Sequence, residues 1–548
     1  MKHLKMAAVL GIVALILYLS LLSTNFNGDG LGYARLVEDS DSARLFSVSA
    51  RLLFCPTGKV VLGVAHLIGS DIRSVTALQI LNSIFGALGV AFFFLTSFHV
   101  SKSIGISIAS ALGLAFSYSY WFWCTNATSY PGNMFFLILT LYLLVRLTKT
   151  AQGSRYVFLS LLIGLTHALA GFFWLTALLL VPAVMVAVYA AGDLKTVSGR
   201  IRATFAYLIS FSFFLFGPLL IAGFATGRVD SLSQFPSWLS AASYGIPPDL
   251  SLINFSRGII GFSSSIVHLA DVGPMIKQII WHVPFTAESK MRLHVETAMF
   301  MLLWAVLITA LIYIIRRFKD VFSGRYRLAL ILISWALLPI IFGLVWLGSD
   351  TERWLALLPI VWLMFLLIAD HGRRNLARAG RCVLETALWT VVVVVATYNL
   401  ATAFVPNHDS ENNPYMQSAR QLSEQMSEKD IVLLWGHDHV FTGDHLAYFF
   451  NRQSLHIGQV GRERPDDALT ILDQVVRERF SAGGRIFVSG RIFLDEDVPE
   501  SHVSESESSI SRLQYRALFS KYHRTEALVC GDDIYWELFP TDIQSTPG

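Results

Sequence analysis

The sequence predicts a polytopic α-helical membrane protein of about eleven transmembrane helices, followed by a small C-terminal extracytoplasmic α/β domain. Of its 548 residues, 54% are hydrophobic and only 15% are charged, against about 25% in soluble domains. Apolar segments recur over residues 1–404, and the composition becomes that of a soluble protein over residues 405–548. The net charge of +3 is too small to indicate a nucleic-acid partner.

Basic clusters between the apolar segments orient the predicted helices, because cytosolic loops are enriched in Lys and Arg. Lys2 and Lys5 predict a cytosolic N-terminus, and residues 6–24 form a first helix that we expect to be retained as a signal anchor. The other helices are expected at residues 75–98, 104–120, 132–147, twice within 156–190, and at 204–224, 296–315, 328–347, 355–369 and 383–404.

The apolar block 156–190 fits either one long tilted helix or two short ones. The basic clusters at residues 316–327 and 373–381 are both cytosolic only if this block crosses the membrane twice. We therefore expect a hairpin with its break between Gly164 and Gly171, where His167 caps a helix end.

Two long loops are expected outside the cytosol, at residues 25–70 and 225–293. The second contains apolar pieces at 259–269 and 275–281, which are typical of helices that lie on the membrane surface.

The C-terminal region alternates between strand and helix patterns, which favours an α/β domain. Strands are expected at 430–435, 484–490 and 535–539, and helices at 418–426, 442–451, 466–480 and 510–522.

The polar residues expected outside the cytosol near the membrane form the candidate site. Asp29 lies between two glycines a few residues after the first helix, so it is either a turn residue or a base at headgroup level. Cations on the same predicted side can bind phosphate. Site candidates in the first loop and in the turn 348–354 are Asp29, Tyr33, Glu38, Asp39, Arg51, Lys59, His66, Glu352 and Arg353.

One cluster in the C-terminal domain leaves a divalent metal open, although no cofactor is certain. His437, Asp438 and His439 follow a predicted strand, and Asp444 and His445 come shortly after. The side chains of the first three alternate in direction, and Asp444 and His445 suit the first turn of a helix, so the sequence favours no metal here. The four cysteines have no metal-type spacing.

Several segments in order along residues 1–360 carry a family resemblance. They are 28–33 (GDGLGY) with the acids after it, 50–56 (ARLLFCP), 117–130 (SYSYWFWCTNATSY), 164–182 and 348–359 (GSDTERWLALLP). With them the chain resembles the GT-C superfamily of integral membrane glycosyltransferases, which use polyprenyl-phosphate sugars. Protein O-mannosyltransferases and the aminoarabinose lipid A transferase belong to that superfamily.

Two positions depart from the pattern of these relatives. Their glutamate in the aromatic stretch falls at Thr128, and their first-loop histidine pair is replaced by Ala50 and Arg51. The role of that glutamate is therefore lost or moved in this chain.

The resemblance implies an inverting hexosyltransferase-type enzyme that moves a sugar from a polyprenyl-phosphate donor to a lipid, glycan or protein acceptor in the cell envelope. Asp29 is the expected general base, because relatives hold an essential acid in the first external loop. Arg353, Arg51 and Lys59 are expected to bind the donor phosphate, with Tyr33, Glu38, Asp39, His66 and Glu352 as further substrate contacts.

Two other functions stay open. A transporter or flippase of lipid-linked sugars would need charged groups inside the helices, and the predicted helices hold few. A non-catalytic scaffold would have no need of Asp29. The expected location is a bacterial plasma membrane, with membrane lipids as neighbours and the C-terminal domain outside the cytosol.

Overall fold

A computed structural model describes residues 2–26, 28–39, 44–149, 154–191, 197–240, 248–269, 287–435, 437–493, 510–530 and 533–540. The chain forms two compact units. The first unit comprises Met1–Ser23 and Leu36–His408, and the second comprises Thr24–Arg35 and Asp409–Gly548. The short segment that carries Asp29 therefore belongs to the same unit as the C-terminal domain.

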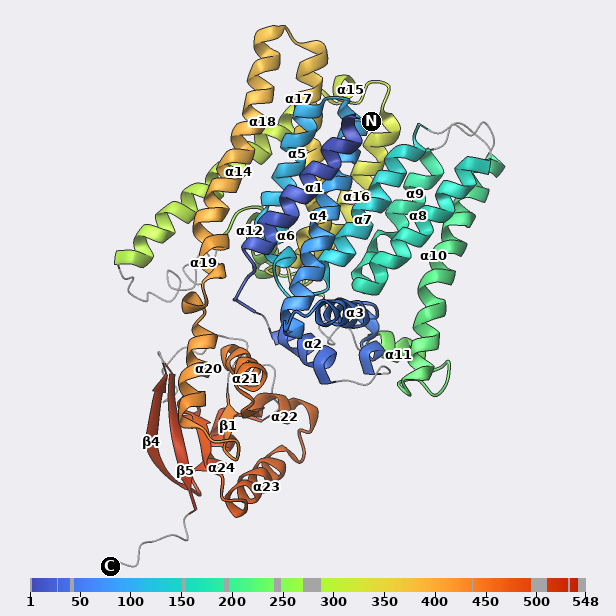
Figure 1. Cartoon of the computed structure of the whole chain (residues 1–548). Helices are drawn as coiled ribbons and strands as arrows, with labels where there is room; N and C mark the ends of the chain where they lie inside the picture. The colour runs from blue at the N-terminus through green and yellow to red at the C-terminus, as the bar shows by residue number, and fades with distance from the viewer. Residues whose placement is uncertain are drawn as a thin grey trace, which may run out of the picture. The chain divides into compact units, whose positions relative to one another are not determined.

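The first unit is a bundle of apolar helices (Figure 1). Nine helices in the described ranges are long and apolar enough to cross a membrane, or ten if the bent pair α5–α6 is one span. The predicted eleventh segment corresponds to Leu175–Ala190, which is apolar but shorter. The bounds are α1 Lys2–Ser20, α4 Ser74–Ser101, α5 Ile104–Phe116, α6 Tyr118–Cys124, α7 Tyr130–Leu147, α8 Ser154–Phe173, η3 Leu175–Leu180, α9 Val181–Ala191, α10 Val197–Ala225, α14 Ala287–Arg316, α15 Phe318–Val321, α16 Tyr326–Val345, η5 Thr351–Leu357, α17 Leu358–Asn375, α18 Arg378–Asn399, η6 Leu400–Phe404 and α19 Val405–His408.

The predicted hairpin break between Gly164 and Gly171 is wrong. Helix α8 runs unbroken through both glycines, and the chain turns at Trp174, whose backbone is extended. The glycines serve packing instead. A Cβ on Gly164 would lie 2.5 Å from the Tyr207 carbonyl oxygen of α10, so these helices approach as closely as they do only because Gly164 has no side chain.

His167 is satisfied inside this packing. One ring nitrogen lies 2.9 Å from the Tyr207 hydroxyl, and the other lies 2.8 Å from the Ala177 carbonyl oxygen in η3. His167 therefore contacts a backbone carbonyl, as predicted, but this carbonyl lies within η3 and not at a helix end.

The two predicted external loops contain short helices. The first loop holds α2 (Gly28–Asp39), η1 (Arg44–Phe46), η2 (Ser49–Arg51) and α3 (Phe54–Leu67). The second holds α11 (Phe235–Ser240) and α12 (Leu252–Ile266). Helix α12 begins seven residues before the predicted interfacial helix 259–269, and its glycine face packs on the end of α16, where Gly258 faces the Gly343 carbonyl. The predicted helix 275–281 lies outside the described residues.

The second unit contains a five-stranded sheet of order β2-β1-β3-β5-β4. Strand β1 is parallel to β2 and β3, whereas β5 is antiparallel to both β3 and β4. Its elements are α20 Pro414–Gln425, β1 Ile431–Leu434, α21 His437–Phe450, β2 Gln453–His456, α22 Ile457–Glu463, α23 Ala468–Ser481, β3 Ile486–Ser489, η8 Gly490–Phe493, α24 Arg512–Phe519, β4 His523–Cys530 and β5 Asp533–Phe539.

Three of these strands confirm the sequence prediction, and two were missed. Strands β1 and β3 are fully buried apolar runs, which makes them easy to recognise. Strand β2 (QSLH) is short and half exposed at the sheet edge, and β4 begins with the polar residues HRTE. Neither carries a periodic apolar pattern that would separate it from a loop.

Candidate functional site

Arg51 lies inside the first unit, where a 3₁₀ turn and contacts with α7 and α8 hold it in place. It ends the 3₁₀ turn η2, and only 7% of its surface is exposed. Its Nη2 donates to the Tyr130 hydroxyl at 3.3 Å, and its guanidinium carbon lies 5.5 Å from the centre of that ring. Two residues on, the Leu53 amide donates to the Phe172 carbonyl at 3.2 Å, which fixes the turn against α8.

Arg353 lies on the 3₁₀ helix η5, at the start of the span that continues as α17, with 9% of its side-chain surface exposed. Its guanidinium carbon lies 4.5 Å from the Trp346 ring centre and 5.3 Å from the Trp174 ring centre. Its Nη2 lies 3.6 Å from an Asp350 oxygen and 3.8 Å from a Glu352 oxygen. Its Nε is buried and has no hydrogen-bond partner in the part of the chain that the structure describes.

Two aromatic rings connect these arginines. Tyr130, the partner of Arg51, meets Trp174 edge to face, with ring centres 4.8 Å apart. Trp174 in turn lies beside the Arg353 guanidinium. We call Arg51, Tyr130, Trp174, Glu352 and Arg353 the arginine–aromatic cluster. It joins the first-loop turn, α7, the turn after α8, and η5.

The cluster is suited to binding a phosphate group. Guanidinium groups bind phosphate through two parallel hydrogen bonds, and stacking on aromatic rings holds their planes in place before a ligand arrives. The carboxylates beside Arg353 lie beyond hydrogen-bond distance, so the donors of Arg353 are not consumed by them. Glu352 lies close enough to both arginines to interact with each electrostatically.

Three other predicted site residues have structural partners in the first unit. The Lys59 ammonium donates to the Val37 carbonyl at 2.6 Å and so caps the end of α2. The Glu38 carboxylate accepts two hydrogen bonds from the Arg73 guanidinium, at 3.2 and 3.0 Å, and one from the Ser74 amide at the start of α4.

An exposed His66 ring nitrogen lies 3.3 Å from the Ile72 carbonyl oxygen. The Asp39 side chain lies outside the described residues. Lys59, Glu38 and His66 therefore each have a hydrogen-bond partner within the first unit. A role of these side chains in binding substrate stays a prediction.

Asp29 lies in the second unit, in the first turn of α2, with an exposed side chain. Its neighbour Gly28 packs so closely on Asp444 that a Cβ would lie 2.5 Å from the carboxylate. The pKa of Asp444 is raised to about 6, because burial and the charge of Asp29 raise it by more than nearby Arg35 lowers it. Tyr33, on the same helix, is buried.

Two members of the C-terminal histidine cluster, Asp444 and His445, have described side chains. The side chains of His437, Asp438 and His439 lie outside the described residues. Both ring nitrogens of His445 are engaged, one with the Phe441 carbonyl at 2.7 Å and one with the Asn413 amide at 3.2 Å. Burial lowers the pKa of His445 to about 4. Among the described residues, no group of three His, Cys, Asp or Glu side chains could hold a metal.

Comparisons with known proteins identify the fold. Residues 53–198 match the family described as "Protein O-mannosyl-transferase TMEM260 N-terminal domain". The crystal structure of ArnT from Cupriavidus metallidurans in the apo state is similar with a TM-score of 0.56 and 12% identity, covering 97% of each chain. The chain therefore shares the fold of ArnT. ArnT bound to undecaprenyl phosphate is similar with a TM-score of 0.52, again at 12% identity and 97% of each chain. A search of curated proteins finds no match.

The predicted resemblance to the GT-C superfamily and the predicted fold class are thus confirmed. The segment matched by the family contains Tyr130 and Trp174, two cluster residues that the sequence analysis did not single out. Tyr130 closes the aromatic stretch that carried the resemblance, and this was the signal available for it. Nothing in the sequence marked Trp174 as a neighbour of Arg353.

Proposed function

We propose that this protein transfers a sugar from a polyprenyl-phosphate donor to an extracytoplasmic acceptor. The observation that carries the proposal is the arginine–aromatic cluster, in which two buried guanidinium groups adjoin a tyrosine and tryptophan pair. A structurally similar protein, ArnT, is known in a complex with undecaprenyl phosphate, which supports a lipid phosphate as the ligand.

In the proposed reaction, the bond between the anomeric carbon and the phosphate oxygen breaks, and the polyprenyl phosphate leaves with the bonding electrons. Arg51 and Arg353 stabilise the negative charge that develops on the departing phosphate. Because phosphate is already a good leaving group, this step needs charge stabilisation more than it needs a proton donor.

The acceptor hydroxyl attacks the opposite face of the sugar, and Asp29 takes its proton as general base. The anomeric configuration is then inverted. The acceptor is a lipid, a glycan or a protein, and the transferred group is of the hexose type. Lys59, Tyr33, Glu38, Asp39, His66 and Glu352 stay in the proposal as further substrate contacts, with Glu352 the one that adjoins both arginines.

The test uses the purified full chain with a polyprenyl-phosphate hexose of known anomeric configuration and a panel of hydroxyl acceptors. We expect a product of inverted configuration from the wild type. Asp29→Asn should abolish transfer while the protein remains monodisperse in detergent, and Asp29→Glu should retain part of the activity. Full activity of Asp29→Asn would remove Asp29 from the mechanism, and a product of retained configuration would remove the single-displacement reaction.

A further inference from the structure

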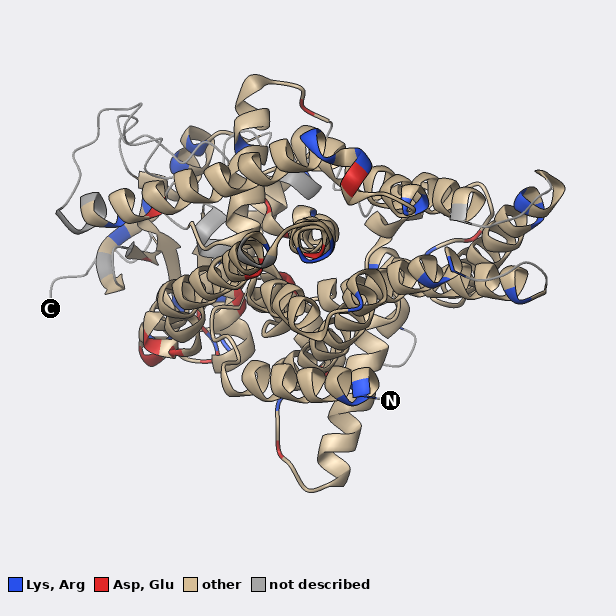
Figure 2. Cartoon of the chain, turned by 90° about the horizontal axis from the view of Figure 1, so that it is seen from above, with Lys and Arg blue, Asp and Glu red and all other residues tan. Residues whose placement is uncertain are grey.

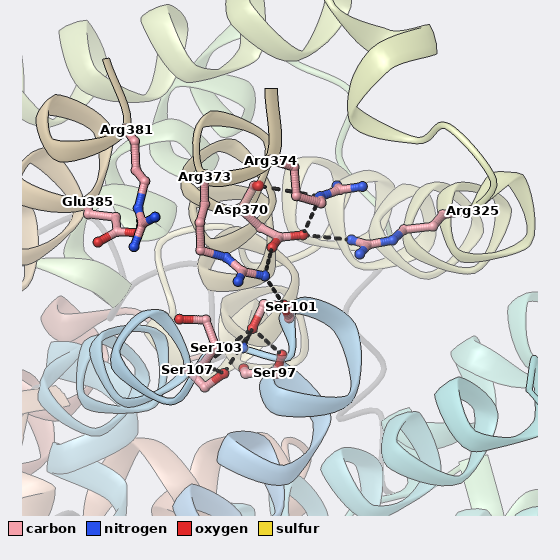
Figure 3. Close-up of polar contacts among 10 residues, drawn as sticks. All are labelled: Ser97, Ser101, Ser103, Ser107, Arg325, Asp370, Arg373, Arg374, Arg381 and Glu385. Atoms are coloured by element: carbon pink, nitrogen blue, oxygen red, sulfur yellow. Dashed lines mark hydrogen bonds and ion pairs between the residues drawn. The ribbon is translucent and has the colours of Figure 1, made fainter. Parts of the chain in front are cut away.

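A second charged cluster lies at the end of α17 and the start of α16, in the basic segments predicted to be cytosolic. Asp370, near the end of α17, is fully buried and pairs with three arginines. The distances are 2.9 Å to Arg325, 3.0 Å to Arg373 and 3.1 Å to Arg374, and Figure 3 shows the three guanidinium groups converging on the one carboxylate. This group therefore keeps a net positive charge of two.

The Asp370 group is fixed to the neighbouring helices. Arg373 also donates to the Ser101 carbonyl at 2.6 Å, at the end of α4, and the Ser101 hydroxyl lies 3.0 Å from that of Ser107 on α5 (Figure 3). Arg325, immediately before α16, is held in place by its ion pair with Asp370. Figure 2 looks onto this end of the bundle, where Lys and Arg recur on the helix ends.

A cavity of about 300 Å³ opens beside Arg325, between the end of α4, the end of α7 and the start of α16. Lys149, Arg325 and Arg327 line it together with Thr148 and Tyr326. Among the described residues, no Asp or Glu lines the cavity. The remaining lining includes apolar side chains, so the cavity combines a cationic rim with an apolar wall.

The cations at this cavity repel one another. Partial burial, together with the nearby charges of Lys102 and Arg325, lowers the pKa of Lys149 to about 8. The Lys149 ammonium donates to the His99 carbonyl, which leaves two of its three protons for another acceptor. The start of α16 adds the partial positive charge of a helix N-terminus, and no side chain caps it.

We propose that this cavity binds a phosphate group, carried by the headgroup of an anionic lipid or by a soluble phosphate ester. Three cations, one just after the end of α7 and two at the start of α16, line a space large enough for such a group, and an anion bound there would offset their mutual repulsion. The apolar wall and the position at the ends of membrane-spanning helices favour the lipid, because basic pockets between such helices bind anionic headgroups. This site is separate from the arginine–aromatic cluster, and the inference does not depend on sugar transfer.

The experiment measures thermal stabilisation of the detergent-purified full chain by phosphatidylglycerol, by phosphatidylcholine and by inorganic phosphate. The test variant is Lys149→Gln/Arg327→Gln, which spares Arg325 and its buried ion pair. The matched control is Lys319→Gln in α15, an exposed cation that does not line the cavity. Lys149→Arg/Arg327→Lys keeps both charges and should behave as the wild type.

We expect phosphatidylglycerol to stabilise the wild type and Lys319→Gln equally, and phosphatidylcholine to stabilise neither. The half-saturating phosphatidylglycerol concentration should rise about 25-fold in the double Gln variant, about fivefold for each cation removed. If inorganic phosphate produces the same variant-sensitive stabilisation, the ligand is a soluble phosphate. If neither ligand stabilises the wild type, or if all variants respond equally, the proposal is wrong. Lys149→Gln alone replaces the double variant if the latter is not monodisperse.

Discussion

Replacing Arg353 by Lys separates the charge of the arginine–aromatic cluster from its geometry. Lysine keeps the positive charge beside Asp350 and Glu352 but cannot form two parallel hydrogen bonds with a phosphate. The contacts of Arg353 with two indole rings hold its guanidinium group in position for a ligand. Losing these contacts would loosen that position, but it would not itself remove a hydrogen bond to the phosphate.

The magnitude follows from the hydrogen bonds that the phosphate would lose. A hydrogen bond to a charged group contributes about 1.5 to 3 kcal/mol. Arg353→Lys should lose one such bond, about 1.5 kcal/mol, and bind the donor roughly tenfold more weakly. Arg353→Ala should lose both bonds, at least about 3 kcal/mol, and bind roughly 150-fold more weakly.

The assay is a titration of each purified variant with polyprenyl phosphate in detergent, followed by tryptophan fluorescence or calorimetry. Arg317→Lys is the control, because Arg317 is a largely exposed arginine that also faces a carboxylate, Asp320, at 3.6 Å. It should bind as the wild type does. Dissociation constants for both Arg353 variants within twofold of the wild type would refute the assignment of Arg353 to the phosphate.

Three further predictions follow from buried carboxylates. Glu352→Gln removes a negative charge beside the proposed phosphate, so titration should show tighter donor binding, and weaker binding would contradict this reasoning. Asp370→Asn leaves three arginines without their carboxylate and should cost about 3 to 5 kcal/mol of stability, seen as a lower Tm. Glu385→Gln, which breaks a more exposed pair in the same region, should cost less than about 1 kcal/mol, and equal losses would refute the distinction. Because the folded chain holds a proton on Asp444 more tightly than the unfolded chain does, the stability of the wild type should fall as pH rises from about 4 to 6. Asp444→Asn should remove that fall and be more stable by about 3 kcal/mol at pH 7, and parallel pH profiles of the two proteins would exclude the effect.

The fold class could be predicted because it depends on patterns within single segments. Apolar length predicts membrane helices, and buried apolar runs predict β1 and β3. The break after α8 was misplaced because glycines such as Gly164 and Gly171 are typical both of turns and of close contacts between helices. Only the partner helix α10 decides between these two readings.

The site could be predicted only in part, for a related reason. Arg51 and Arg353 are recognisable as cations in expected external segments, and both belong to the same cluster, Arg51 buried and Arg353 with a side chain that is 9% exposed. Their connection through Tyr130 and Trp174 depends on contacts between residues far apart in sequence. Lys59 has the same charge pattern in sequence, yet it caps a helix end, which no local signal distinguishes from phosphate binding.

The proposed function requires that the chain break the bond between sugar and phosphate in a lipid-linked donor. The most direct measurement follows a labelled polyprenyl-phosphate hexose in proteoliposomes that contain the purified full chain, and quantifies free polyprenyl phosphate by mass spectrometry. The account predicts acceptor-dependent release of polyprenyl phosphate by the wild type and none by Arg51→Ala/Arg353→Ala. Movement of the intact donor across the bilayer without release would contradict the account and favour a transporter.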